Sequence, residues 1–154
     1  MEYTTGMAID RSNNIIVTNG TKYIQAYDSN GNLRFKFEGN CIYNDGVTVN
    51  TNGDIIVIED NHKIEVFNSN GIFKFAFGKQ GNQDGEFNYP RGVTTNEKGQ
   101  IIVADSGNKR IQVFDSNGKF LFKFGSEGID DGQFNWNSGI TTNKNQQIIV
   151  TDSL

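Results

Sequence analysis

Residues 91–137 decide the fold, and they read RGVTTNEKGQIIVADSGNKRIQVFDSNGKFLFKFGSEGIDDGQFNWN. The stretch predicts strands over 92–95, 101–104, 110–114 and 120–124, because β-branched and aromatic residues favour strands. Turns rich in Gly, Asn and Asp separate them, including an Asn-Gly pair that is a strong hairpin signal. The consecutive apolar residues at 101–104 predict a strand buried on both faces. One unit of this kind therefore predicts a four-stranded antiparallel sheet.

The same unit recurs along the chain. The glycine that opens each copy recurs at spacings of 40, 46 and 47 residues, at Gly6, Gly46, Gly92 and Gly139. An Ile-Ile-Val triplet marks the second strand of every copy, and Asn-Gly pairs recur before the fourth strand. A period of roughly 40–50 residues that contains four strand signals is typical of a β-propeller blade.

These units predict one all-β propeller domain over residues 1–154. The unit bounds are about 1–44, 45–90, 91–137 and a partial unit 138–154 that holds two strand signals. The chain thus predicts about three and a half four-stranded blades. An arc of this kind leaves apolar blade faces open, and open apolar surfaces of that size mark interaction sites. We expect the arc to close by self-association as a homo-oligomer or to be a fragment of a larger propeller.

The links between units are of two lengths. Residues 78–90 (GKQGNQDGEFNYP) and 125–137 (GSEGIDDGQFNWN) match each other, whereas the link at 38–44 is six residues shorter. Aromatic residues in these links are predicted to anchor them between blades. They are Phe87, Tyr89, Phe134 and Trp136 in the long links, with Ile42 and Tyr43 in the short one.

The run IIVADSGNKRIQVFDSNGKFLFKFGSEGIDDGQF at 101–134 resembles an NHL repeat, and weaker copies extend over the rest of the chain. The second unit departs from the pattern at 58–63, and the first departs further at 18–23. The resemblance implies an NHL-repeat β-propeller. It does not imply one activity, because propellers host many unrelated functions.

Composition and charge limit the function classes. The net charge of −4 disfavours nucleic acid as the main partner, because phosphate binding relies on clustered Lys and Arg. Cys41 is the only cysteine, so no intrachain disulfide forms. We identify no signal peptide and no apolar run long enough to span a membrane, and we expect a cytoplasmic protein.

Candidate catalytic and metal-binding residues are few. The turn Asp105–Arg110 has Asp, Asn and Arg together, but turn chemistry and an Arg–carboxylate pair explain that choice. The acidic links at 84–86 and 130–131 lack the ligand spacing of an EF-hand loop. His62 is the only histidine, too few for a catalytic zinc or a Ser-His-Asp triad, and is expected in an exposed turn. We therefore predict no enzyme, no metal and no cofactor.

The leading prediction is a non-enzymatic scaffold that binds a protein or peptide partner on its loop face. Aromatic and arginine side chains dominate contact sites, and on the geometry that the resemblance implies, the predicted contact residues are Lys79, Tyr89, Arg91, Lys109, Arg110 and Trp136.

Two alternatives remain open. Some NHL propellers bind RNA on the same face, although acidic residues are interspersed there. The second alternative is a metal-dependent propeller lyase or lactonase, which the missing histidines disfavour.

Overall fold

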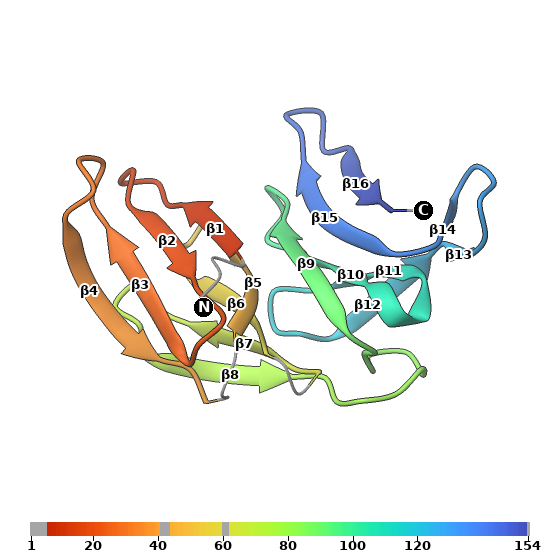
Figure 1. Cartoon of the computed structure of the whole chain (residues 1–154), viewed down its shortest axis with the longest axis horizontal. Coiled ribbons are helices and arrows are strands. Elements are labelled where there is room, and N and C mark those ends of the chain that lie inside the picture. Colours follow the sequence, from red (N-terminus) through yellow and green to blue (C-terminus); the bar gives the residue numbers. More distant parts are fainter. Residues whose placement is uncertain (1–5, 41–43, 60–61, 154) are drawn as a thin grey trace.

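The computed structural model describes residues 6–40, 44–59 and 62–153. The described strands form an arc of sheets that is open between β1 and β16 (Figure 1). Three sheets have four antiparallel strands, as predicted, and we call them blades 1 to 3. A further antiparallel pair, the half-blade, follows them. The only helical element in this part of the chain is a short 3-10 turn, so the prediction of an all-β fold is confirmed.

The strand bounds follow the sequence units. Blade 1 contains β1 (Gly6–Ile9), β2 (Ile15–Thr18), β3 (Tyr23–Tyr27) and β4 (Leu33–Glu38). Blade 2 contains β5 (Asn44–Val49), β6 (Ile55–Glu59), β7 (Ile64–Phe67) and β8 (Phe73–Phe77). Blade 3 contains β9 (Pro90–Thr95), β10 (Ile101–Asp105), the 3-10 turn η1 (Ser106–Asn108), β11 (Arg110–Phe114) and β12 (Phe120–Phe124). The half-blade contains β15 (Asn137–Thr142) and β16 (Ile148–Asp152), and the link before it contains the short parallel pair β13 (Ser126–Glu127) and β14 (Gln133–Phe134).

The opening glycines lie where the inner strands of neighbouring blades meet. β1 lies beside β5, β5 beside β9, and β9 beside β15, along the inside of the arc (Figure 1). A Cβ on Gly6 would lie 2.8 Å from the carbonyl oxygen of Asp45, and one on Gly46 would lie 2.6 Å from that of Arg91. Only glycine permits so close an approach of two backbones. The glycine spacing found in the sequence is therefore the spacing of the inner strands.

The core lies between blades rather than within one sheet. Between blades 1 and 2, Ile16 and Ile24 pack with Val57 and Phe67. A second cluster joins blades 2 and 3, and a third joins blade 3 to the half-blade. Burial depends on this stacking. All residues of β6 and β10 are buried, as predicted for strands covered on both faces, whereas β2 and β16 at the ends of the arc are buried only in part.

The phenylalanines of the outer strands show the same dependence. Phe37 of blade 1 packs on Phe67 of blade 2, and Phe77 of blade 2 packs on Phe114 of blade 3, each pair with ring centroids 5.0 Å apart. Phe124 occupies the matching position in blade 3, but it is 39% exposed. The half-blade has no third strand in the described chain to cover it.

The predicted Asn-Gly hairpins are confirmed. Gly71 and Gly118 adopt φ values of +76° and +81°, which favour glycine. A Cβ on Gly118 would also lie 2.6 Å from the ring of Phe77 in the preceding blade. The turn residue is thus required twice, by its own backbone and by the neighbouring blade.

Within the described residues, no helix has the length and hydropathy needed to cross a membrane. Cys41, Ile42 and Tyr43, named in the sequence-based predictions, lie outside the described residues.

Candidate functional site

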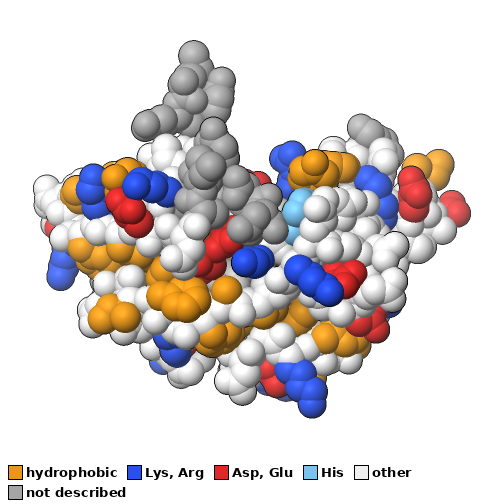
Figure 2. All heavy atoms as spheres, turned by 90° about the horizontal axis from the view of Figure 1, so that it is seen from below, with side chains coloured by type: hydrophobic (Ala, Val, Ile, Leu, Met, Phe, Trp, Pro, Cys, Tyr) orange, Lys and Arg blue, Asp and Glu red, His pale blue; other side chains and the backbone are white. Residues whose placement is uncertain are grey.

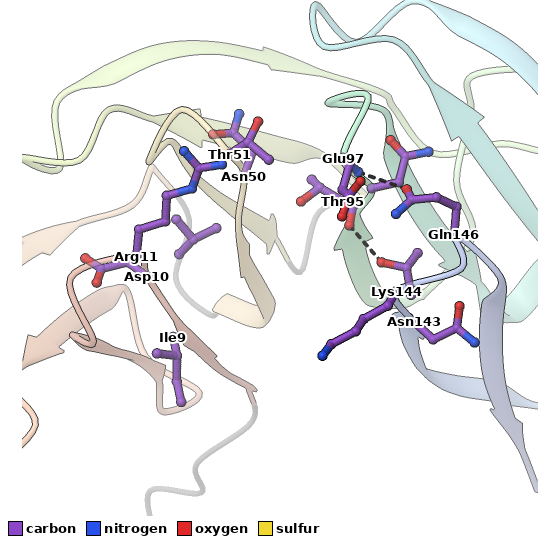
Figure 3. Close-up of a pocket in the computed structure, with 13 residues that line it drawn as sticks. Ile9, Asp10, Arg11, Asn50, Thr51, Thr95, Glu97, Asn143, Lys144 and Gln146 are labelled. Carbon is purple, nitrogen blue, oxygen red and sulfur yellow. Dashed lines mark hydrogen bonds between the residues drawn. The ribbon is translucent and has the colours of Figure 1, made fainter.

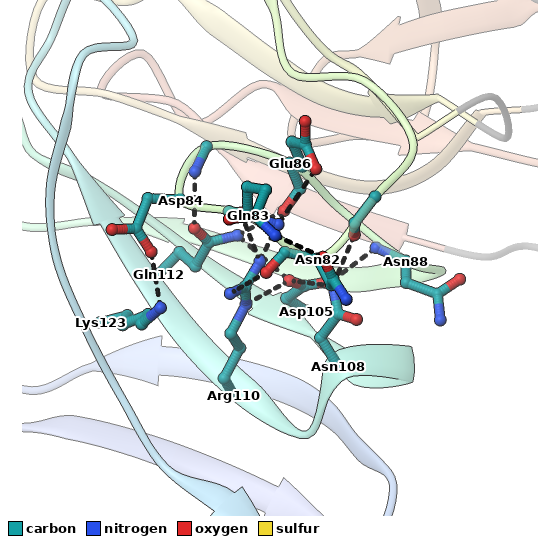
Figure 4. Close-up of polar contacts among 12 residues, drawn as sticks. Asn82, Gln83, Asp84, Glu86, Asn88, Asp105, Asn108, Arg110, Gln112 and Lys123 are labelled. Atoms are coloured by element: carbon teal, nitrogen blue, oxygen red, sulfur yellow. Dashed lines mark hydrogen bonds and ion pairs between the residues drawn. The ribbon is translucent and has the colours of Figure 1, made fainter.

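The first long link, 79–89, is held by one buried arginine (Figure 4). Arg110 Nε donates to Asp105 Oδ2 at 2.7 Å, and its terminal nitrogens donate to the carbonyl oxygens of Asn82, Gln83 and Glu86, each at 2.9 Å. The arginine side chain is almost fully enclosed, and Asp105 is completely buried. A buried charge pair of this kind is stable only when its remaining donors and acceptors are satisfied, as they are here.

Asp105 is the acceptor at the centre of this cluster. It takes the backbone N–H of Asn88 at 2.7 Å and the side-chain amides of Asn108 and Gln112, at 2.9 and 3.1 Å. Pairing of Arg110 with a carboxylate and carbonyl groups is confirmed. Turn chemistry does not explain Asp105, because its side chain makes no capping bond to the backbone of η1. The turn joins blade 3 to the link in front of it.

Arg110 must therefore be removed from the predicted contact residues. Its residue exposure is 6%, and its guanidinium is consumed by the four bonds to Asp105 and the link. Sequence reasoning placed it on the surface because its position follows a turn. The structure shows that the link folds over that position.

Three of the other predicted contact residues come together. The guanidinium carbon of Arg91 lies 5.4 Å from the ring centroid of Trp136, and Lys109 Nζ lies 4.4 Å from it. Cations over an indole face are attracted to its π electrons. These residues come from β9, from the position after η1, and from the link before β15. We call them the tryptophan cluster.

Lys79 and Tyr89 lie in other surroundings. Lys79 Nζ pairs with Glu86 at 3.2 Å within its own link. Tyr89 is 59% exposed, so the prediction that it anchors the link is wrong. Phe87 is fully buried and does anchor it, and Phe134 packs as a partly buried residue against the cluster between blade 3 and the half-blade.

His62 is buried rather than exposed, which corrects the sequence prediction. Its Nδ1 accepts the backbone N–H of Tyr89 at 2.9 Å, and the two rings lie edge to face at 5.0 Å. Its exposure is 8%. The histidine fixes the end of the first long link, and no sequence signal distinguished this role from an exposed turn.

A cleft of about 320 Å³ lies on the inside of the arc, at the level where each inner strand begins. The same offset in successive units carries unlike side chains there, an acid at Asp45, a cation at Arg91 and a hydroxyl at Ser138. Burial raises the pKa of the Asp45 carboxyl, and the charge of Arg91 offsets part of that effect. Arg91 also belongs to the tryptophan cluster, so cleft and cluster are continuous. We call this the upper cleft.

A second cleft of about 310 Å³ lies at the other end of the inner strands (Figure 3). It is lined by the turns that join the first and second strands of each unit. Arg11 and Lys144 reach into it from blade 1 and the half-blade, and the backbone N–H of Glu97 donates to Gln146 at 3.1 Å across its wall. The turn position that follows the first strand also differs between units here, and it is occupied by Arg11, Thr51, Glu97 and Lys144.

Among the described residues, no group of three or more His, Cys, Asp or Glu side chains is placed to hold a metal ion. Charged side chains of both signs are interspersed on the face seen in Figure 2 rather than separated by sign.

Comparison with known proteins supports the assignment made from the residues. Residues 87–114 match the NHL repeat. Residues 87–114 are therefore an NHL repeat, in a chain whose sheets are arranged as in part of a β-propeller. No curated protein matches it in sequence. Residues 87–114 include both Asp105 and Arg110, whereas the link carbonyl groups that Arg110 binds lie just before the matched segment.

Solved structures give the same fold. A streptogramin B lyase matches with a TM-score of 0.75 at 18% identity, over 97% of this chain and 48% of that one. A catalytically inactive virginiamycin B lyase from Staphylococcus aureus, with quinupristin, matches with a TM-score of 0.74 at 18% identity, over 98% and 49%. A Bacteroides caccae protein of unknown function matches at 13% identity with a TM-score of 0.68, over 98% and 53%. The chain spans about half the length of these structures.

These matches overturn the prediction that the chain is not an enzyme. That prediction rested on the single histidine, yet the backbone follows half of a protein that is named as a lyase. Histidine content in half of such a fold does not decide the activity of the whole, because catalytic groups can come from any blade. At 18% identity the likeness shows the fold and does not transfer the reaction.

Proposed function

We propose that the chain supplies the substrate-binding half of a closed, lyase-type β-propeller, with the ligand held in the upper cleft. The observation that carries this proposal is that Asp45, Arg91 and Ser138, three unlike polar side chains, converge in one cleft. One of them, Arg91, also lies over the ring of Trp136. A binding site needs a few polar groups of different chemistry that converge.

The chemistry of the cleft indicates a ligand with a carboxylate or carbonyl oxygen beside a flat group. Arg91 and Lys109 supply positive charge, and Trp136 between them supplies a stacking surface. A peptide partner of the kind predicted from the sequence has this chemistry. Asp45, half-buried, would accept a hydrogen bond from an amide or hydroxyl of the same ligand.

Proton-transfer groups would come from the other half of the ring. The matched lyase lost activity in a variant whose description names a histidine-to-alanine change. Here the one histidine, His62, is buried and its Nδ1 is occupied by Tyr89 N–H. A second copy of this chain would bring the same buried histidine. A catalytic ring therefore needs a second half of different sequence, whereas two identical halves would bind ligand without histidine chemistry.

The test uses quinupristin as the probe and the emission of Trp136, the single tryptophan, as the signal. We expect a saturable change in emission and at least a tenfold loss of affinity in Arg91→Ala. Lys144→Ala, at the opposite cleft, is the matched control and should bind normally. An unchanged emission at the highest soluble concentration, or equal losses in both variants, would refute the proposal.

A second candidate function is binding of single-stranded RNA, which the tryptophan cluster favours because bases stack on aromatic side chains beside cations. Its affinity should fall steeply with salt and be lost in the Arg91→Glu/Lys109→Glu double variant. If the chain does not bind single-stranded RNA at low salt, this candidate function is refuted.

Self-association remains a proposal that the open ends of the arc support. Met7 and Ile9 of β1 and Leu33 of β4 are exposed at one end, and Ile149 of β16 is exposed at the other. Light scattering at micromolar concentration should show a multimer. A folded monomer would contradict it.

A further inference from the structure

A pocket of about 370 Å³ lies between the first long link and the turn η1. We call it the amide pocket, because its lining consists of amide side chains and one glycine. The lining residues are Gln80, Gly81, Asn82, Asn88 and Asn108, none of which carries a charge. Blades 2 and 3, which the first link joins, are both complete four-stranded sheets. The ends of the arc therefore form no part of this pocket.

Hydrogen bonds between the link and η1 fix the walls of the amide pocket. Asn88 O accepts the N–H of Gly107 at 2.7 Å, and the N–H of Asn88 donates to Asp105 at 2.7 Å. Asn108 Nδ2 donates to Gly81 O and to Asp105 Oδ2, both at 2.9 Å. Because these bonds hold the lining residues in place before any ligand arrives, little ordering entropy is lost on binding.

The lining amides keep hydrogen-bonding groups free for a ligand. In the part of the chain that the structure describes, the side chains of Gln80 and Asn88 make no hydrogen bond, so each offers an acceptor and two N–H donors. Asn108 uses both N–H groups of its amide, and its Oδ1 remains an acceptor. Asn82 Oδ1 accepts from Gln83 Nε2 at 2.9 Å, which leaves the Asn82 N–H groups as donors. Free donors and acceptors thus converge in one uncharged pocket.

These groups match a ligand with several hydroxyl groups. A hydroxyl donates and accepts at once, so neighbouring hydroxyls can pair with both the N–H and the C=O of an amide. An ion would leave water without a counter-charge in the pocket, since Asp84 and Lys123 of this region lie on the other side of the Arg110 cluster (Figure 4). An apolar ligand would leave the amides unpaired. The volume is near the lower end of the range of about 300–1,000 Å³ for ligand sites, which suits one or two rings.

We propose that the amide pocket binds a neutral saccharide of one or two rings through its hydroxyl groups. Gln80 and Asn88 pair with neighbouring hydroxyls through complete amides, while Asn82 donates and Asn108 Oδ1 accepts. The pocket shares no lining residue with the upper cleft. Saccharide binding is therefore independent of the ligand site proposed above.

The second long link provides a reference for the design of variants. It has Glu127 and Ile129 at the positions of Gln80 and Asn82. Both links nevertheless contain the same backbone hydrogen bond from their second glycine to the phenylalanine carbonyl, at 2.9 Å in the first link and 3.2 Å in the second. The exchange variant Gln80→Glu/Asn82→Ile thus places a charge and an apolar side chain in the pocket without changing the conformation of the link.

The test follows the side-chain amide signals of the isotope-labelled full chain by NMR during a sugar titration. The probes are the methyl glycosides of glucose, galactose and mannose. We expect at least one of them to shift the signals of Gln80, Asn88 and Asn108 in a saturable manner, with each signal assigned from the single variant that lacks it. N-methylacetamide, which has a peptide amide and no hydroxyl, is the control compound and should not saturate.

Variants of the chain complete the test. Asn88→Ala removes an amide that makes no side-chain hydrogen bond in the described chain, so the fold should persist while affinity for the sugar falls about tenfold. Asn135→Ala is the same change at the matching position of the second link and should alter affinity less than twofold. The exchange variant should abolish saturation. Arg91→Ala should leave sugar binding intact, which separates this site from the upper cleft.

The opposite results would overturn the proposal. They are shifts that do not saturate with any of the glycosides at their highest soluble concentration, or equal losses of affinity in Asn88→Ala and Asn135→Ala. If N-methylacetamide shifts the same signals as strongly as the sugars at equal concentration, the pocket recognises a peptide backbone and the saccharide assignment is wrong.

Discussion

The two long links, 79–89 and 126–136, are identical at five of eleven positions and have different surroundings. The first is covered by a complete blade and tied down by Arg110. The second has the same internal hydrogen bonds but lies beside a two-stranded half-blade. The conformation of each link is therefore set by its own hydrogen bonds, while its stability depends on the third strand of the following blade. Four experiments can break or sharpen this comparison.

The largest effect is expected for Arg110→Met. It leaves Asp105 buried without its cation, which typically costs about 3–5 kcal/mol. Urea denaturation followed by circular dichroism measures the loss. Arg91→Met, a change of the same kind at an exposed arginine, should cost less than about 0.5 kcal/mol. Similar stabilities for the two variants would mean that the first link does not depend on the buried pair.

The second experiment compares Phe77→Ala with Phe124→Ala. Phe77 contacts Phe87 and Phe114, so its removal should destabilise the chain by about 3 kcal/mol. Phe124 is at the same position of the next blade but is partly exposed, and about 1 kcal/mol is expected. Equal losses in thermal or urea unfolding would show that the half-blade interface is covered in solution.

The third experiment places a Cβ in each link. Gly78 and Gly125 have φ values of +90° and +93°, and a Cβ on either would press on the following phenylalanine ring. Gly78→Ala should cost about 2–3 kcal/mol because Phe87 is fully enclosed and cannot move. Gly125→Ala should cost about 1 kcal/mol less, since Phe134 is only partly buried and can shift. The unfolding midpoints of the two variants measure these losses of stability. A larger loss in Gly125→Ala than in Gly78→Ala would contradict the comparison.

The smallest effect concerns pH. A hydrogen bond from the backbone of Gln83, helped by Lys79, lowers the pKa of the Glu86 carboxyl below its ordinary value of 4.5. A lowered pKa stabilises the first link above pH 4.5, and that stabilisation is lost as pH falls through the folded-state pKa. Gln133 holds the same place in the second link and does not titrate.

Amide-exchange protection at Gln83 and Asp130, recorded between pH 6 and pH 3, measures this difference. Protection at Gln83 should fall with pH while that at Asp130 stays constant. Glu86→Gln is the control and should make the two links respond alike. A parallel loss at both positions in the wild-type chain would show that acid acts on the arc as a whole.

Much of the fold was predictable because its signals are local. Turn residues such as Asn117-Gly118 set the hairpins, and the opening glycines set the inner strands. The site was predictable only in part. Arg91, Lys109 and Trp136 were among the predicted contact residues, and the structure brings them together, while their role in binding stays a prediction. The burial of Arg110 and His62 was not predicted, because it depends on a link that folds back from another unit.

The Ile-Ile-Val triplets show what each level of structure determines. By itself the sequence determines that every triplet is a strand, since β-branched residues between turn signals favour no other local structure. Only the tertiary structure decides what each strand buries. The middle residue is fully enclosed at Ile56 and Ile102 but 49% exposed at Ile149. The physical reason is that burial belongs to a pair of surfaces, and the strand carries only one of them.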